Sequence, residues 1–336
     1  MAPASPYSNR IAIYKAIEKQ RGSRVLAFAT GDRPNMQAQI SNDAVDLFGD
    51  HLDEIFPTKK ISLILYTLGG NTMAAWNLVN MLRMFCDELE IIVPNKARSA
   101  GTLMCLGADK IVMTKQATLG PIDPSVNGPL NPQIPGAAPE SRAPVSVEAV
   151  KGYIEMAKSD FGVKSGADMA RILTDLSNKV HPLVLGAIFR SRSQIQSLAK
   201  ELLTGQVKDA VKRKKIIDFL CSESGSHDYT INRREAKALG LNVEKPSDNL
   251  YALLKDWVQH VRKDLELAVP FDTNAILGVN SSAAYSCVRC LLESTAAPRN
   301  FFVTEGELKR VQYNHPQFGP QDGINDNRTF EGWRTT

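Results

Sequence analysis

The fold of this chain is decided by the stretch ISLILYTLGGNTMAAWNLVNMLRMFCDELEIIVPNKARSAGTLMCLGADKIVM, residues 61–113. Runs of consecutive apolar residues in it predict buried strands, and apolar residues that recur at helical spacing predict helices. The two patterns alternate, with strands predicted over 61–66, 90–94 and 110–113 and helices over 72–86 and 100–108. Strands with continuous apolar faces that alternate with helices indicate a parallel sheet covered on both sides. The sequence therefore predicts an α/β fold.

Two turns lie at the carboxyl ends of the first two strands, at Thr67–Asn71 and Lys96–Ala100. In open parallel sheets, functional sites collect at the carboxyl ends of strands. Gly69 and Gly70 let the main chain approach a reacting oxygen, and the helix that begins near Thr72 has unpaired N–H groups that stabilise negative charge. A Gly-Gly turn also serves as a plain connection between a strand and a helix. It is not a dinucleotide-binding fingerprint, because the third glycine of G-x-G-x-x-G is absent.

The second turn places Ser99 at the start of a helix built of small residues. This position suits a nucleophile, since N–H groups such as that of Ala100 stabilise an alkoxide or an oxyanion. It also suits a plain N-cap, a role that serine fills well. The two turns together favour the nucleophile, because adjacent strand ends then offer donors and a hydroxyl to a single carbonyl.

Outside this stretch, most of the predicted elements are helices. A strand is predicted over 24–30, a long proline-rich loop over 120–146, and helices over 10–21, 41–56, 147–161, 165–179, 183–203, 207–220, 234–239 and 249–267. We expect one domain over residues 1–245 and a C-terminal helical extension with a polar tail over 246–336. The chain after about Asn314 is expected to be poorly ordered.

Four segments together resemble one known family: YTLGGNTMAA (66–75), KARSAGT (96–102), LGADKIVM (106–113) and LGPIDP (119–124). They are similar to the serine dehydrogenase proteinase family, a branch of the Clp-type and signal-peptide-peptidase-A-type serine peptidases. The resemblance covers about residues 10–241 and implies a Clp/crotonase-like fold of repeated β-β-α units with additional C-terminal helices. It also implies hydrolysis of peptide bonds, with Ser99 as the nucleophile and Gly69, Gly70 and Ala100 as the oxyanion hole.

Two positions depart from the pattern of that family. Leu68 stands where a proline usually precedes the Gly-Gly pair, which should alter the stiffness of the loop more than the chemistry. Clp proteases carry their catalytic histidine after the third strand, but Thr118–Pro124 holds no histidine, only Asp123. The general base must therefore come from elsewhere in the chain.

Three residues are candidates for this base. His227 lies shortly before Glu235–Leu241, a segment that resembles a family element just behind the triad aspartate of Clp proteases, and Asp228 could orient its imidazole. His181, between two predicted helices, is the second candidate. Lys151 is the third, because signal peptide peptidases use a Ser-Lys dyad in which burial lowers the lysine pKa. A loop histidine, a capping histidine and a solvated lysine are the respective alternatives without a catalytic role.

Composition sets the remaining expectations. The chain of 336 residues has 43% apolar and 23% charged residues, as ordinary globular proteins do. A net charge of +4 is too small to indicate nucleic acid or a membrane surface, and no run approaches the roughly 18 apolar residues of a membrane span. Five cysteines without framework spacing and the lack of a signal peptide indicate a reducing, cytoplasmic setting. The C-x-x-C pair Cys287 and Cys290 is expected to pack on one helix. The scattered histidines predict no metal site, and the lack of a nucleotide-binding fingerprint predicts no cofactor.

Two other classes of protein remain as alternatives. One is a non-proteolytic scaffold or partner-binding member of the same fold, which the missing histidine after the third strand keeps open. The other is an acyl-CoA enzyme of the crotonase type, which shares the oxyanion hole but needs no nucleophile, so Ser99 argues against it. Relatives of this fold form rings or stacked oligomers, and we expect a homo-oligomer that acts on a peptide or protein substrate.

Overall fold

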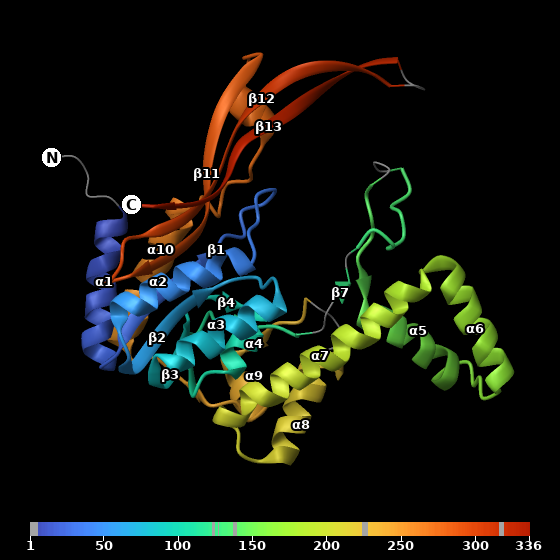
Figure 1. Cartoon of the computed structure of the whole chain (residues 1–336), viewed down its shortest axis with the longest axis horizontal. Coiled ribbons are helices and arrows are strands. Elements are labelled where there is room, and N and C mark those ends of the chain that lie inside the picture. Colours follow the sequence, from blue (N-terminus) through green and yellow to red (C-terminus); the bar gives the residue numbers. More distant parts are fainter. Residues whose placement is uncertain (1–5, 123–124, 127, 137–139, 224–227, 316–318) are drawn as a thin grey trace. The chain divides into compact units, whose positions relative to one another are not determined.

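The computed structural model describes residues 6–122, 125–126, 128–136, 140–223, 228–315 and 319–336 (Figure 1). The chain divides into two compact units. The first unit joins residues 1–119 to residues 231–336, and the second contains residues 120–230. This grouping differs from the expected boundary at residue 245, because strands from the C-terminal third pair with strands of the N-terminal third in one sheet.

The first unit is built on an eight-stranded mixed sheet. Five strands are parallel: β10 (Val243–Glu244), β5 (Lys110–Met113), β3 (Cys86–Val93), β2 (Thr58–Tyr66) and β1 (Arg24–Thr30), in this spatial order. The last four were predicted as strands, and β10 was not. Beyond β1 the sheet continues with three antiparallel strands, β11 (Ser282–Ser294), β12 (Asn300–His315) and β13 (Gly319–Thr335). The parallel half confirms the α/β prediction, and the antiparallel half is new.

Four helices cover this sheet: α1 (Pro6–Arg21), α2 (Val45–Ile55), α3 (Thr72–Met84) and α10 (Asp248–Asp264). On one face, Tyr14 of α1 and Trp257 of α10 join side chains of β1, β2, β3 and β5 in a single core. On the other face, Phe48 of α2 meets Phe28 of β1 edge-on, with 5.1 Å between the ring centroids. Phe28 points to this face because successive side chains of a strand alternate, and it lies next to Ala27, which belongs to the first core.

A small sheet and several short helices complete the first unit. The small sheet contains β4 (Lys96–Ala97), β6 (Thr118–Leu119) and β9 (Ile231–Asn232), in this order. The short helices are η1 (Asn42–Ala44), α4 (Ala100–Leu106), α9 (Arg233–Ala238) and α11 (Thr273–Leu277). β4 leads directly into the turn that carries Ser99, so the small sheet fixes the chain on one side of that turn.

The C-terminal region differs from its prediction in two ways. The expected helical extension with a polar tail contains one long helix, α10, followed by the three strands β11 to β13. The chain after Asn314, expected to be poorly ordered, forms β13, which pairs with β12 from Gly319 to Thr335. The sequence did not predict this strand because its side chains are mostly polar. They are polar because β13 is the edge strand of the sheet and most of its residues are exposed.

The C-x-x-C pair also differs from its prediction. Cys287 and Cys290 lie on β11, not on a helix, and both are buried. They pair with Thr304 and Phe302 of β12, two residues apart on one face of the sheet. A register shift between Val288 and Cys290 adds one residue to β11, so a spacing of three, which is typical of a helix face, keeps both thiols on the same face of a strand.

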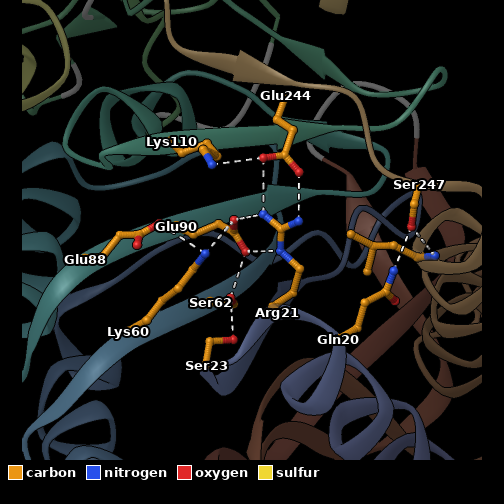
Figure 2. Close-up of polar contacts among 11 residues, drawn as sticks. Gln20, Arg21, Ser23, Lys60, Ser62, Glu88, Glu90, Lys110, Glu244 and Ser247 are labelled. Atoms are coloured by element: carbon orange, nitrogen blue, oxygen red, sulfur yellow. Dashed lines mark hydrogen bonds and ion pairs between the residues drawn. The ribbon is translucent and has the colours of Figure 1, made fainter.

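A charged network ties the N-terminal helix to the sheet (Figure 2). The guanidinium of Arg21 in α1 is paired with both Glu90 of β3 and Glu244 of β10. The Glu90 side chain is fully buried, and it also accepts a hydrogen bond from Ser62 and pairs with Lys60 at 3.3 Å. Partial burial opposes the charged form of Glu244, but its hydrogen bonds to Arg21 and Lys110 hold its pKa below the usual range. The network therefore joins α1 to β2, β3, β5 and β10.

The described residues of the second unit form four helices, a short pair of strands and an irregular segment between those strands. Its helices are α5 (Val147–Ser159), α6 (Gly166–Lys179), α7 (Pro182–Gln206) and α8 (Ala210–Asp218), followed by a π-helical turn, η2 (Phe219–Glu223). The strands β7 (Ser125–Val126) and β8 (Val145–Ser146) pair with each other inside the predicted loop over 120–146. Val145, Val147, Val184 and Ile188 form a small core between α5 and α7.

Candidate functional site

The two turns predicted to form the site lie side by side at the carboxyl ends of β2 and β3. Thr67, directly after β2, donates its backbone N–H to Lys96 O at 3.0 Å and accepts from Arg98 N at 3.1 Å through its carbonyl. These bonds pair the start of the Gly-Gly turn with β4 and with the residue before Ser99. Two turns separated by nearly thirty residues in sequence thus form one local structure.

Ser99 has a backbone conformation that side chains rarely adopt. Its φ is 50° and its ψ is −118°, whereas a residue other than glycine with positive φ is strained by about 1–3 kcal/mol. Ser99 precedes α4 at the N-cap position, but its hydroxyl makes no capping hydrogen bond. The side chain is half-buried. The N-cap alternative for this serine therefore has no support in the geometry of its side chain.

Gly69 lies directly against Ser99. A Cβ added to Gly69 would lie 2.7 Å from Ser99 Cβ, 2.9 Å from Arg98 O and 3.2 Å from Ala100 N. Gly69 and Gly70 both have positive φ values, of 116° and 143°. Only glycine allows this approach, and it brings the backbone of the Gly-Gly turn to the serine and to the first N–H of α4.

The two glycines of the turn differ in where their N–H groups point. The N–H of Gly69 donates to the side-chain oxygen of Thr67 at 2.9 Å. Gly70 forms a β-bridge with Ile40 in which the bonds are made by Gly69 O and Asn71 N, so the N–H of Gly70 is not used. Among the described residues, neither the N–H of Gly70 nor that of Ala100 has a hydrogen-bond acceptor.

A charged cluster that the sequence analysis missed lies at the same strand ends. Asp32, two residues after β1, accepts hydrogen bonds from Tyr66 Oη at 2.7 Å and from Lys96 Nζ at 2.6 Å. Burial opposes the charged form of Asp32, but the bonds from Lys96 and Tyr66 hold its pKa below the usual range. Burial and the charge of Asp32 raise the pKa of Tyr66. The sequence signal that could have found this cluster is polar residues at the ends of apolar strands or a few positions beyond them.

The three candidate bases all fall in the sequence range of the second unit. His181 is the N-cap of α7, where its Nδ1 accepts from Leu183 N at 3.2 Å, and it is exposed. Lys151 lies on α5, with its Nζ 3.6 Å from a carboxylate oxygen of Glu155. His227 lies outside the described residues. The first two therefore have structural partners of their own, and the geometry of His227 is not described.

The described side chains bear on metal binding and on disulfide bonds as well. In the part of the chain that the structure describes, no three His, Cys, Asp or Glu side chains lie close enough together to hold a metal ion. All five cysteines are free. Burial raises the pKa of the Cys290 thiol to about 12, which keeps it protonated near neutral pH.

The class of the protein follows from the fold and from the pairing of these turns. The structure is of the mixed α/β, ClpP/crotonase-like class, as the sequence predicted. The chain belongs to the ClpP-like SDH-type serine proteinase family, whose sequence model matches residues 54–273. The family predicted from the four segments is thus confirmed, and the match covers both turns.

Two curated relatives come from Methanocaldococcus jannaschii, and both are uncharacterized. MJ0137 is 32% identical over 206 residues, and the alignment covers 61% of each chain, less than two thirds of the relative's length. MJ1495 is 26% identical over 245 residues, with 70% of this chain and 71% of the relative covered.

The chain is also similar to two solved structures of the 1510-N membrane-bound stomatin-specific protease. A serine-to-alanine variant is 19% identical, with 65% of this chain and 79% of the other covered, at a TM-score of 0.37. A lysine-to-alanine variant in complex with a substrate peptide is 18% identical, with 63% and 73% covered, at a TM-score of 0.38. In the described part of this chain, no helix combines the length and the apolar character needed to cross a membrane.

Proposed function

We propose that this protein is a serine peptidase that hydrolyses peptide bonds through an acyl-enzyme on Ser99. The observation that carries the proposal is the backbone of Ser99, strained at a φ of 50° with a hydroxyl that caps nothing. Strain of this kind persists only where the surroundings enforce it, and it is common at catalytic residues. Nucleophilic serines on strained turns between a strand and a helix expose their hydroxyl in the same way.

The oxyanion hole that we propose uses the N–H groups of Gly70 and Ala100. Both belong to the turns that meet at Ser99, and neither has an acceptor among the described residues. Gly69, which the sequence analysis included as a donor, instead has its N–H bonded to Thr67 and provides the close approach. Preorganised N–H donors that await a developing negative charge are a main source of rate acceleration in acyl transfer.

The chemical steps follow from these roles. The Ser99 oxygen attacks the carbonyl carbon of the peptide while its proton passes to a general base, and the carbonyl oxygen takes its negative charge into the oxyanion hole. The base then gives that proton to the leaving amine as the C–N bond breaks. A water molecule, deprotonated by the same base, then attacks the ester carbonyl, and the base returns that proton to the Ser99 oxygen as the ester bond breaks and the acid product leaves. We propose His227 as this base, with His181 and Lys151 as the other candidates.

Labelling with a fluorophosphonate probe tests the proposal. The wild-type protein is expected to form a covalent adduct on Ser99, detected by mass spectrometry, and Ser99→Ala is expected to form none. Ser177→Ala is the matched control, because its exposed hydroxyl only donates to Leu173 O within α6. An unlabelled wild type would overturn the peptidase and favour the scaffold. If the wild type is labelled, the base is identified by three variants, His227→Gln, His181→Gln and Lys151→Met. The residue whose replacement alone abolishes labelling is the base.

We also propose that the protein is a cytoplasmic homo-oligomer. Five free cysteines, four of them buried, suit a reducing compartment. Gel filtration of the full chain at micromolar concentration is expected to give a mass above that of one chain, and a strict monomer would contradict the oligomer. Fractionation of cells that express the native protein checks the compartment.

A further inference from the structure

We propose that Thr67 is a positioning residue for the oxyanion hole, and that its hydroxyl is what leaves the N–H of Gly70, not of Gly69, facing the reacting carbonyl. This inference rests on the proposed function and adds a residue that does not touch substrate. Thr67 is fully buried and follows the last residue of β2, Tyr66. Its side chain acts on the substrate only through the backbone of the Gly-Gly turn.

Thr67 contacts both turns of the site at once. Its backbone N–H and carbonyl are bonded to Lys96 and Arg98, so the main chain of Thr67 is fixed to the strand that leads into Ser99. Its methyl group occupies the space beside Gly101, where an added Cβ would lie only 2.4 Å from Thr67 Cγ2. The methyl on one side and the backbone bonds on the other leave the hydroxyl pointing to the Gly-Gly turn.

The hydrogen bonds of this hydroxyl decide which N–H is available. Thr67 Oγ1 accepts the N–H of Gly69 at 2.9 Å and lies 2.7 Å from Thr30 Oγ1, the last residue of β1. With the N–H of Gly69 satisfied in the interior, the next N–H along the chain belongs to Gly70. The bridge from Ile40 takes the opposite edge of Gly70, because it bonds to Gly69 O and Asn71 N. The turn is thus held from two sides in the conformation that exposes Gly70 N–H.

Without the hydroxyl, the buried N–H of Gly69 would have no acceptor. A buried unpaired N–H is costly, so the turn would rotate to find a partner or water, and Gly70 would rotate with it. Because the donors of an oxyanion hole must lie about 2.7–3.1 Å from the oxyanion, a small rotation is enough to lose one of them. Thr67 is therefore expected to affect the rate of acylation and not the binding of substrate.

The test compares Thr67→Val, which replaces the hydroxyl by a methyl group of similar size, with Thr67→Ser, which keeps the hydroxyl. The measured quantity is the second-order rate of fluorophosphonate labelling of Ser99 in the full chain. We expect Thr67→Val to slow labelling by about 10- to 100-fold, less than or equal to the loss of a whole donor, and Thr67→Ser to stay within about fivefold. The pH midpoint of labelling should be the same in all three proteins, since the base is unchanged.

Thr114→Val provides the matched control. Thr114 is a buried threonine after β5 whose hydroxyl accepts Gln116 N at 3.1 Å and donates to Pro94 O at 2.7 Å, which is the same local motif away from Ser99. Loss of the Thr114 hydroxyl is expected to lower the melting temperature as Thr67→Val does, whereas Ser99 should still be labelled at close to the wild-type rate. Should Thr67→Val fail to fold, the comparison of Thr67→Ala with Thr67→Ser tests the hydroxyl, because both lack the methyl group and they differ only in the side-chain oxygen.

The outcomes separate the inference from the proposed function. An unlabelled wild type refutes the peptidase itself. A labelled wild type with Thr67→Val at the same rate refutes only the positioning role. Equal slowing in Thr67→Val and Thr67→Ser refutes it as well, because the methyl packing and not the hydroxyl would then be responsible. Slowing in Thr67→Val with rescue by serine and an unchanged pH midpoint supports it.

Discussion

Replacing Gly69 by alanine should inactivate the protein while leaving it folded. The new Cβ would lie 2.7 Å from Ser99 Cβ and 2.9 Å from Arg98 O, where ordinary contacts begin at 3.4 Å. The two turns must therefore separate by about 0.7 Å, the difference between 3.4 and 2.7 Å. Since the backbone on both sides of Gly69 is bonded to neighbouring segments, this separation displaces Ser99 and the adjacent donors together.

The size of the effect follows from two contributions. A left-handed backbone costs alanine about 1–2 kcal/mol, and forcing an extra methyl group into packed surroundings costs about 1–3 kcal/mol. We therefore expect the free energy of unfolding to fall by about 2–5 kcal/mol. A misplacement approaching 1 Å costs on the order of 100-fold in rate, so labelling of Ser99 should slow by about that factor or more.

The assay combines fluorophosphonate labelling with urea unfolding, and Gly49→Ala is the matched control. Gly49 lies inside α2, where a new Cβ would meet nothing within 4 Å. Alanine there should raise the free energy of unfolding by about 0.5–1 kcal/mol and leave labelling unchanged. Labelling of Gly69→Ala at the rate of Gly49→Ala would refute the reasoning, because the close contact of Gly69 with Ser99 would then have no role.

Three further predictions concern stability. Glu293→Gln should lower the free energy of unfolding by about 3–5 kcal/mol in urea titrations, because the fully buried Arg10 would lose a carboxylate at 2.7 Å; a loss below 1 kcal/mol would contradict this. Burial lowers the pKa of His51, so the unfolded chain takes up the proton more readily below about pH 6.5. Stability should therefore fall from pH 7 to pH 5, and less steeply in His51→Gln; parallel pH profiles would disprove it. Phe56→Gly should raise the melting temperature, since Phe56 is exposed with a φ of 60° and a ψ of 163°, a region that glycine adopts without strain. Phe161→Gly, which lacks the positive φ, should not, and equal shifts would show that strain is not the cause.

Much of the parallel half of the sheet could be predicted from the sequence. The strand over 110–113 has the bounds of β5, and the apolar run before Gly69 is the buried part of β2. These elements could be predicted because a strand buried on both faces is apolar at nearly every position, which gives a run of consecutive apolar residues in the sequence. The same local signal located Gly69, Gly70 and Ser99 at strand ends.

The antiparallel half could not be predicted in this way. β13 has one edge and much of both faces in solvent, so its sequence carries no apolar period. The spacing of Cys287 and Cys290 suggested a helix, since residues three apart share a helix face. The register shift between Val288 and Cys290, which depends on the partner strand, instead places both cysteines on one face of a strand. In both cases the deciding contacts come from pairing with β12, and this pairing is not encoded in the residues of β11 or β13 taken alone.

By itself, the sequence determined the alternation of strands and helices, the family, and the positions of the two turns, since all three depend on residue types close together in the chain. Only the tertiary structure decided that Ser99 is strained and caps nothing, that Gly69 touches it, and that the Thr67 hydroxyl holds the N–H of Gly69. These features arise where β1, β2 and β4 meet, and pairing between distant segments sets distances that no local pattern encodes. The chemistry proposed for Ser99 therefore begins in the sequence, and its geometry comes from the fold.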